Sequence, residues 1–284
     1  MGRRAEREVE RLQRAGTRVI FDANVNYYEI WGDYDVPGTK PTPAARRAAI
    51  WMTAHADWVV ADSSYLAAVA RKYAPNVTWI PDNVDIDVYA GQRRHVRRPL
   101  LTLIWSGVAK KALHLRLIAD VIGRLKDVEL LLVCDEAPDL GWLLSSVPRR
   151  VLSFSDRRYA AALLDADVII SPKHLSNGYE MAHTEYKISL GMAVGLPAIA
   201  SPQPSYVEAV NALGGGIIAR SPDEWQCAIE ALRDAELRAR MGAVARRTIV
   251  ERYSTPVVAR AYAEVLGTLT GTVLLEDVVA SVHG

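Results

Sequence analysis

The sequence predicts an α/β fold with two lobes, each built around a parallel sheet. The first observation is that short apolar runs, typical of buried strands, alternate with longer amphipathic segments along most of the chain. The second is the length of 284 residues, which corresponds to about two domains. The third is that half of the residues are hydrophobic, enough for each lobe to bury its own core.

The first lobe is predicted to span residues 1–97 and to hold fewer strands than a complete lobe. Ala5, Val9 and Leu12 have helical spacing, and Gly16 is a stop signal for that helix. The other elements expected here are strands at 17–21, 58–61 and 77–80, and helices at 43–55 and from Asp62 or Ser63 to Tyr73. A complete lobe of this kind has about six strands, so this lobe is predicted to be partial.

Residues 91–99 are predicted to link the two lobes as a solvated hinge. The segment is polar, carries four arginines and ends at Pro99. Such a cluster could also bind RNA. The whole chain has 34 Lys and Arg against 33 Asp and Glu, however, and this balance disfavours a nucleic-acid partner.

The second lobe, residues 98–284, is predicted to be complete. Strands are expected at 100–105, 128–134, 151–153, 168–171, 197–200 and 216–219. Helices are expected at 111–125, 140–146, 157–164, 181–194, 206–211, 222–233, 235–252 and 256–266. Six strands separated by helices describe one doubly wound, Rossmann-like sheet.

Composition excludes several other classes of protein. Cys134 and Cys227 have neither the number nor the spacing of a disulfide framework or a metal site, and both are expected to be buried, inert thiols. No apolar stretch approaches the roughly 18 residues of a membrane span, and the basic residues near Met1 lack the apolar segment of a signal peptide. A cytoplasmic protein is therefore expected, with a peripheral position at the inner membrane face as the alternative.

The turn at residues 106–111 is the first candidate site. It follows the opening strand of the second lobe, at the edge where open α/β sheets bind ligands. Gly107 would let the backbone approach a phosphate beside Ser106. Lys110 and Lys111 would lie in the first helical turn, which is unfavourable for cations unless an anion binds there. Two solvated lysines are the alternative interpretation. The turn lacks the spacing of a nucleoside triphosphatase loop.

The loop at residues 171–180 is the second candidate site. Asn177 and Gly178 predict a turn with positive φ, whose amides could bind an anion. On one continuous helix at 181–194, His183 and Lys187 would share a face, as would Met181 and Glu185. An ordinary turn with a polar helix surface is the alternative.

Residues 187–210 carry a family resemblance. Residues 191–201 match the pattern Ala-Met-Ala-x-Gly-x-Pro-Val-Val-Ala-Ser, and 204–210 match Pro-x-x-x-Glu-x-Val. These patterns resemble the carboxyl-terminal signature of the family 4 glycosyltransferases, which have the GT-B fold. Further similar segments are 20–22, 56–60, 80–85, 214–218, Trp225, 234–238 and 251–254.

The resemblance implies a retaining, metal-independent transfer of a sugar from a nucleoside diphosphate donor to an unidentified acceptor. It implies no cofactor besides the nucleotide sugar, which is a co-substrate, and it leaves the catalytic residues unassigned. The donor diphosphate would contact Ser106, Gly107, Lys110, Lys111 and Lys187. The donor sugar and nucleoside would lie near Asn177, Gly178, Glu180, His183 and Glu185.

Two departures from the family motivate an alternative. The family has two glutamates where this chain has Ala182 and Leu190, and Leu190 cannot accept bonds from ribose hydroxyls. Glu180 or Glu185 would compensate only if the loop register differs. The other departure is the partial first lobe, which in the family supplies the acceptor site. His55 lies there, at an ordinary helix end, where a structural role is expected.

The alternative is a non-catalytic GT-B-like partner or regulatory subunit. An incomplete lobe has an exposed sheet edge, which a second copy or another chain would cover. An epimerase or a phosphorylase on the same fold is a third hypothesis. An epimerase needs paired acid–base groups in the cleft, and the sequence does not indicate such a pair.

Overall fold

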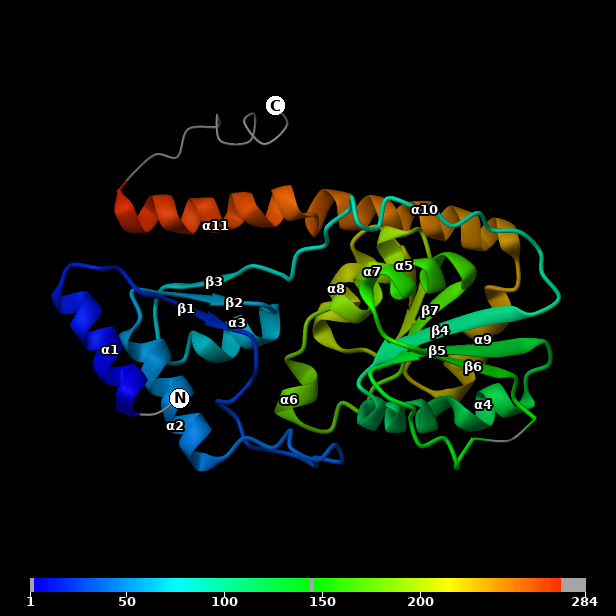
Figure 1. Cartoon of the computed structure of the whole chain (residues 1–284), viewed down its shortest axis with the longest axis horizontal. Coiled ribbons are helices and arrows are strands. Elements are labelled where there is room, and N and C mark those ends of the chain that lie inside the picture. The colour runs from blue at the N-terminus through cyan, green and yellow to red at the C-terminus, as the bar shows by residue number, and fades with distance from the viewer. Residues whose placement is uncertain (1–2, 144–145, 272–284) are drawn as a thin grey trace. The chain divides into compact units, whose positions relative to one another are not determined.

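The computed structural model describes residues 3–143 and 146–271 (Figure 1). They form two compact units that are interleaved along the chain. Within these residues, unit 1 takes in 3–83, 176–184 and 254–271, and unit 2 takes in 84–143, 146–175 and 185–253. The division into domains at residues 97 and 98 stays a prediction, and each unit is described by itself below.

Unit 1 contains a parallel sheet in the order β1-β2-β3. Its strands are β1 (Ile20–Ala23), β2 (Trp58–Ala61) and β3 (Val77–Trp79), and its helices include α1 (Arg3–Arg14), α2 (Pro43–His55) and α3 (Ser64–Ala70). The Thr42 side chain accepts from Ala45 N and begins α2, while Ser63 Oγ accepts from Leu66 N and begins α3. Of the two predicted caps for α3, the structure therefore uses Ser63.

Both faces of the unit 1 sheet are covered. Val59 and Ala61 face a core that includes Leu66 of α3. Val60 faces the other way, against Val258 of α11 (Thr255–Thr270), which runs along the sheet (Figure 1). This inward packing from both sides explains why the strands read as continuous apolar runs.

Unit 2 contains a six-stranded parallel sheet in the order β6-β5-β4-β7-β8-β9. Its strands are β4 (Leu101–Gly107), β5 (Val128–Cys134), β6 (Arg149–Ser153), β7 (Val168–Ser171), β8 (Ala198–Ala200) and β9 (Gly216–Ile218). Its helices are η1 (Ala109–Ile118), α4 (Ala119–Arg124), α5 (Asp156–Asp165), α7 (Tyr186–Ala193), α8 (Pro204–Asn211), α9 (Pro222–Ala231) and α10 (Ala235–Arg252). The predicted doubly wound sheet is confirmed.

The strand order places a topological switch point between β4 and β7. The chain adds β5 and β6 on one side of β4 and then returns to add β7, β8 and β9 on the other side. The chain that leaves β4 therefore runs to one side of the sheet, toward β5, and the chain that leaves β7 runs to the other side, toward β8. Ligands of doubly wound sheets bind at such a point, outside the carboxyl ends of the strands. Here those ends are Gly107 and Ser171.

Three predicted helices differ from the structure. The helix expected at 111–125 begins as the 3-10 helix η1, because Ala109, Ala112, Leu115 and Ile118 are buried and their spacing of three fits its three residues per turn. The helix expected at 140–146 is a turn in its described residues. Asp139 accepts from Gly141 N there, in competition with helical bonding. Residues 144–145 lie outside the described part.

The helix expected at 181–194 is broken into α6 (Gly178–Met181) and α7. Between them, the Ala182 carbonyl accepts a hydrogen bond from Ser63 Oγ at 2.6 Å. The Thr184 hydroxyl donates to Asp82 at 2.8 Å. These partners lie in unit 1, and they replace the bonds that a continuous helix would make.

The linker at 91–99 is not a freely solvated hinge. Arg93 N donates to the Val194 carbonyl, and its guanidinium pairs with Asp167 at 2.9 Å. The His95 ring lies 2.8 Å from the Gly195 carbonyl, and burial lowers the pKa of His95. The segment is bound to unit 2 because its polar side chains find partners there.

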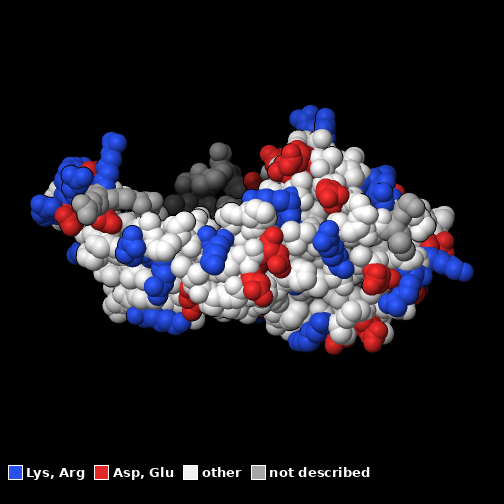
Figure 2. Space-filling model, turned by 90° about the horizontal axis from the view of Figure 1, so that it is seen from below, with Lys and Arg blue, Asp and Glu red and all other residues white. Residues whose placement is uncertain are grey.

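Surface features follow the composition. Figure 2 shows Lys and Arg interspersed with Asp and Glu on the face that it draws. Cys134 is buried, as expected, but Cys227 is exposed, because α9 turns Trp225, Ala228 and Ile229 inward instead. In the described ranges, no helix combines the length and the apolar character that a membrane crossing requires.

Candidate functional site

The turn after β4 brings Gly107 and Lys187 together at the crevice of unit 2. Gly107 has a φ of 157°, and a Cβ added to it would lie 2.6 Å from Lys187 Nζ and 3.0 Å from the Trp105 ring. A side chain at this position would therefore collide with both neighbours. The absence of a side chain at Gly107 leaves room for Lys187 here, and the approach of a phosphate to Gly107 stays a prediction.

Lys187 is held at this turn by Trp105. Lys187 Nζ lies 4.7 Å from the centre of the Trp105 ring, which is 1% exposed. A cation over an indole face is stabilised by the quadrupole of the ring. Lys187 comes from the first turn of α7, and Trp105 from the strand that ends at Gly107. The result is a positive charge fixed at the carboxyl end of β4.

Lys110 and Lys111 lie in the first turn of η1, directly after this turn of chain. Lys110 is exposed and Lys111 is half-buried. The start of η1 already has an anion beside it, since Ala109 N donates to Asp135 Oδ1 at 2.7 Å. Asp135 follows β5 and thus offsets part of the positive charge expected at this helix start.

Two residues next to this turn, Ser106 and Cys134, have side chains that are engaged with or buried in the interior of unit 2. Ser106 Oγ lies 2.8 Å from the hydroxyl of the buried Tyr159, so its hydroxyl bonds to the core side of the strand. Burial raises the pKa of the Cys134 thiol to about 11; the charge of Asp135 adds to this, and that of Lys187 opposes it. Cys134 consequently stays a protonated thiol at neutral pH.

A second group at the same edge of the sheet includes Lys173 and His174 of the second candidate loop, which were not singled out as site residues. Lys173 follows β7 and is buried; its Nζ donates to Gln203 Oε1 at 2.5 Å and lies 5.7 Å from the centre of the Tyr206 ring. Next to it in the chain, His174 N lies 3.3 Å from His114 Nδ1. The signal was the position of Lys173 and Gln203, each just past the end of a buried strand.

Asn177 and Gly178 form a helix start in unit 1. Asn177 Oδ1 accepts from Glu180 N at 2.8 Å, and Asn177 Nδ2 donates to the Asp33 carbonyl at 2.6 Å. Gly178 is the first residue of α6, and the positive φ predicted for it is wrong. The side chain of Asn177 stabilises the short helix directly, so a left-handed turn is unnecessary.

Glu180 and His183 lie close together beside Tyr179. Glu180 is buried, and its Oε2 lies 4.0 Å from His183 Nε2. The His183 ring meets the Tyr179 ring edge-on, with 4.4 Å between centres. Burial raises the pKa of Tyr179 to about 12, and the charge of Glu180 adds to this. These three residues form a compact polar group within unit 1.

Glu185 belongs to unit 2, where it is buried at the start of α7. Burial raises the pKa of Tyr253, and the charges of Glu185 and Glu208 act in the same direction. Because α6 and α7 are separate helices, the shared helix faces predicted for His183 with Lys187 and for Met181 with Glu185 are wrong. Leu190 is packed in the apolar core of unit 2.

Unit 1 also gathers carboxylates at the carboxyl ends of its strands, which the sequence analysis did not identify. Asp22 lies in β1, Asp62 follows β2 and Asp82 follows β3. Burial raises the pKa of Asp62 to about 8, reinforced by the charges of Asp82 and Asp22. Tyr262 donates to Asp22 at 3.3 Å. Within the described residues, no group of His, Cys, Asp or Glu has an arrangement that could hold a metal ion.

Comparisons with known proteins address the fold. No family model and no curated protein matches this chain. Among solved structures, HepE of Anabaena in complex with UDP is similar over 92% of this chain and 75% of its own, with a TM-score of 0.70 and 15% identity. A glycosyltransferase of Rickettsia africae matches over 94% and 80% of the two chains, with a TM-score of 0.65 and 15% identity.

The chain spans 50% of the length of TarM, a further structural neighbour. TarM of S. aureus, solved with UDP, alpha-GlcNAc-glycerol and fondaparinux, is similar over 87% of this chain, with a TM-score of 0.66 and 12% identity. Identities this low establish the architecture and leave the activity open. The α/β fold with parallel sheets and its likeness to GT-B glycosyltransferases are confirmed, while membership of family 4 stays a prediction.

Proposed function

We propose that this protein is a glycosyltransferase that moves a sugar from a nucleoside diphosphate donor to an acceptor. One observation carries the proposal: Lys187 Nζ lies against Gly107 at the crevice where doubly wound sheets bind their ligands. A diphosphate bound at this turn would meet a fixed cation and a backbone without a side chain.

The chemistry needs a group that stabilises the leaving diphosphate. Negative charge grows on the diphosphate oxygens as the bond to the sugar breaks, and a cation already in position lowers the barrier. Lys187, oriented by Trp105, would supply that charge. Lys110 and Lys111, at the start of η1, would add to it. A lysine cradle of this kind is consistent with a metal-independent transfer, which is part of the proposal.

The stereochemistry and the donor are supported by similarity alone. Retention rests on the resemblance of residues 187–210 to the retaining family 4 enzymes. HepE, whose fold is similar, was solved with UDP, so UDP is the first nucleotide to test. Glu180 and His183 are proposed to act on the sugar side of the donor.

The second candidate is a non-catalytic GT-B-like partner or regulatory subunit. Leu190 favours it, because this buried side chain stands where the family has a glutamate for the ribose. A partner chain or a second copy would then complete the active assembly. Sedimentation of the purified chain, alone and with candidate partners, measures this directly.

Calorimetry with UDP, GDP and dTDP tests the proposal. We expect one nucleotide to bind, and we expect Lys187→Met to weaken its binding by about tenfold or more, since a charge-assisted contact is lost. Lys126→Met, which removes an exposed lysine before β5, is the matched control and should leave the affinity unchanged. If none of the three nucleotides binds, the proposal is wrong.

Turnover then separates the two candidates. A panel of sugars on the nucleotide that binds is assayed for hydrolysis and for transfer to simple acceptors. Release of the free nucleotide by the chain alone supports the enzyme. Tight nucleotide binding without release, restored by a second chain, supports the regulatory subunit.

A further inference from the structure

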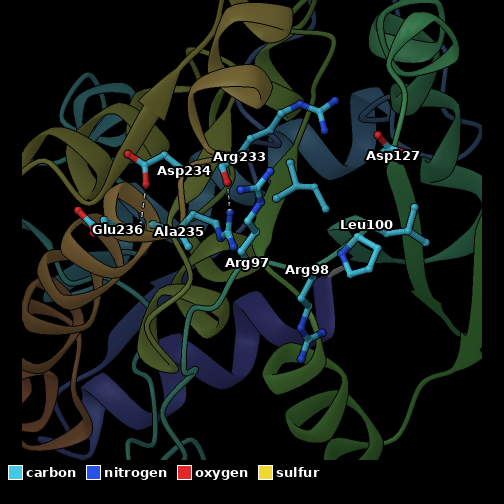
Figure 3. Close-up of a pocket in the computed structure, with 11 residues that line it drawn as sticks. Arg97, Arg98, Leu100, Asp127, Arg233, Asp234, Ala235 and Glu236 are labelled. Atoms are coloured by element: carbon cyan, nitrogen blue, oxygen red, sulfur yellow. Dashed lines mark hydrogen bonds between the residues drawn. The ribbon is translucent and has the colours of Figure 1, made fainter.

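A cavity of about 520 Å³ opens at the opposite end of the unit 2 sheet, where β4 and β5 begin (Figure 3). Its walls come from the end of the linker, the turn before β5 and the start of α10. The charged side chains that line it are Arg97, Arg98, Arg233, Arg238, Asp127, Asp234 and Glu236. The proposed diphosphate site lies at the carboxyl ends of the strands, so this cavity is separate from it.

One residue that lines the cavity, Arg238, belongs to a buried group with more positive than negative charge. Arg93 and Arg238 both pair with Asp167, at 2.9 Å and 3.7 Å, and the three side chains are 6%, 2% and 0% exposed. Two guanidinium groups thus share one carboxylate in the interior. Burial lowers the pKa of Arg238; the charge of Arg93 acts in the same direction, while the charges of Asp167 and Asp234 oppose it. A buried charge without a counterion is costly, which favours an anion nearby.

The hydrogen bonds of these buried arginines do not neutralise the excess positive charge. Arg238 donates to the carbonyls of Leu232, Arg233 and Val96, at 2.7 to 2.9 Å. Its Nε, like Arg93 Nε, is buried and has no partner within the described ranges. Carbonyl groups are dipoles and do not neutralise the extra charge.

Two of the acidic residues at the cavity are engaged elsewhere. Asp234 Oδ1 accepts from Glu236 N and begins α10. Glu236 is 89% exposed and lies 3.9 Å from Arg240 on the same helix. Asp127 is the remaining carboxylate; it is exposed and has a φ of 57°. None of these groups is paired with Arg93 or Arg238.

Arg97 is the residue placed to bind a ligand directly. Across the described chain its guanidinium has no hydrogen-bond or ion-pair partner. Arg233 also lines the cavity, and its guanidinium is paired with Glu230 at 2.6 Å. Arg98 is directed away from both (Figure 3), toward Asp165 at 3.4 Å. Guanidinium groups match phosphate oxygens in geometry and charge.

We propose that this cavity is a binding site for a small phosphate monoester, held directly by Arg97, with Arg233 and the buried Arg238 adding positive charge beside it. The cavity is larger than an inorganic phosphate ion, so the ligand carries an organic part as well. Binding would bridge the linker, through Arg97, to the connection between α9 and α10. It would therefore stabilise unit 2 in the bound state.

Calorimetry of the full chain in a non-phosphate buffer tests the site, with glucose 6-phosphate and inorganic phosphate as probes. We expect glucose 6-phosphate to bind, and Arg97→Ala to weaken its binding by about tenfold, the loss of one charge-assisted contact. Asp127→Asn, which removes a negative charge and suits a left-handed backbone, should tighten binding by about twofold. Arg260→Ala, at an exposed position of α11, is the control and should change nothing.

Two further measurements separate this site from the diphosphate site. Lys187→Met should keep glucose 6-phosphate binding, and Arg97→Ala should keep UDP binding, whether or not the chain has transferase activity. The proposal is overturned if neither probe binds at millimolar concentration, or if Arg97→Ala binds as well as the parent chain. Binding of inorganic phosphate as tight as that of the sugar phosphate would overturn the monoester assignment.

Discussion

Lys187 Nζ lies 4.7 Å from the centre of the Trp105 ring, although the two residues are 82 positions apart in the sequence. The pair places a cation at the end of β4, over the face of an indole ring. A cation that is held by an aromatic ring keeps its charge available to an anionic ligand. This contact is the physical basis of the proposed donor site.

Gly107 leaves the space that Lys187 Nζ occupies, and Gly107→Ala tests whether this space matters for nucleotide binding. The added Cβ would lie 2.6 Å from Lys187 Nζ, at a φ of 157° that side chains rarely adopt. We expect nucleotide affinity to fall by about tenfold, since Lys187 must move. Calorimetry with the nucleotide that binds the parent chain measures the loss. Gly141→Ala, in an exposed turn, serves as the control. Equal affinity for Gly107→Ala and the parent would show that Lys187 does not need its observed position.

Trp105 should act on nucleotide binding through Lys187. Trp105→Leu removes the ring face, and we expect binding to weaken by about threefold to tenfold, in line with a buried cation–π contact. Trp105→Phe keeps a smaller ring and should recover part of the affinity. Circular dichroism first establishes that both variants are folded, and calorimetry then compares them. A role confined to packing would predict the same nucleotide affinity for Leu and Phe.

Asp62 should make the stability of the protein depend on pH. Its pKa is raised by burial to about 8 in the folded chain, against an ordinary value near 4, so the folded state holds an extra proton between these limits. Stability should therefore fall as pH rises from about 4 to 8, by up to about 1.4 kcal/mol per pH unit for this group. Asp62→Asn removes the ionisation and should be more stable than the parent at pH 8.

Urea unfolding at several pH values between 4 and 8 measures this difference. The gap between Asp62→Asn and the parent should close as pH falls, because Asp62 is then protonated and neutral. Asp35→Asn, at an exposed position in the same unit, is the control and should follow the parent. Parallel curves for Asp62→Asn and the parent would mean that Asp62 titrates at its ordinary pKa.

Ser63 should contribute to stability through two bonds. Its hydroxyl oxygen accepts from Leu66 N at the start of α3, and the hydroxyl donates to the Ala182 carbonyl at 2.6 Å. Thr42 makes the helix-start bond alone, to Ala45 N. We expect Ser63→Ala to cost about 2 kcal/mol and Thr42→Ala about 1 kcal/mol. Urea unfolding measures both, and an equal cost for the two would argue against the Ala182 bond.

The strands could be predicted because a strand that is buried on both faces appears in the sequence as a continuous apolar run. Runs such as 128–134 and 168–171 are almost entirely apolar, and both are strands in the structure. Gly107 was proposed to contact a phosphate from the same kind of signal, its place after a buried strand, and that role stays a prediction. These inferences need only neighbouring residues, and for that reason the order of elements in unit 2 was largely correct.

Contacts between distant segments decided the rest. Local sequence favours one helix over 181–194, but Ser63 and Asp82 bind Ala182 and Thr184 and divide it. The sequence predicts that the arginines of residues 91–99 are solvated, but in the structure Arg93 pairs with the buried Asp167. By itself, then, the sequence determined which segments are buried and what elements they form, because periodicity is local. Only the tertiary structure decided which charges meet, because a side chain's partner depends on how the chain folds back on itself.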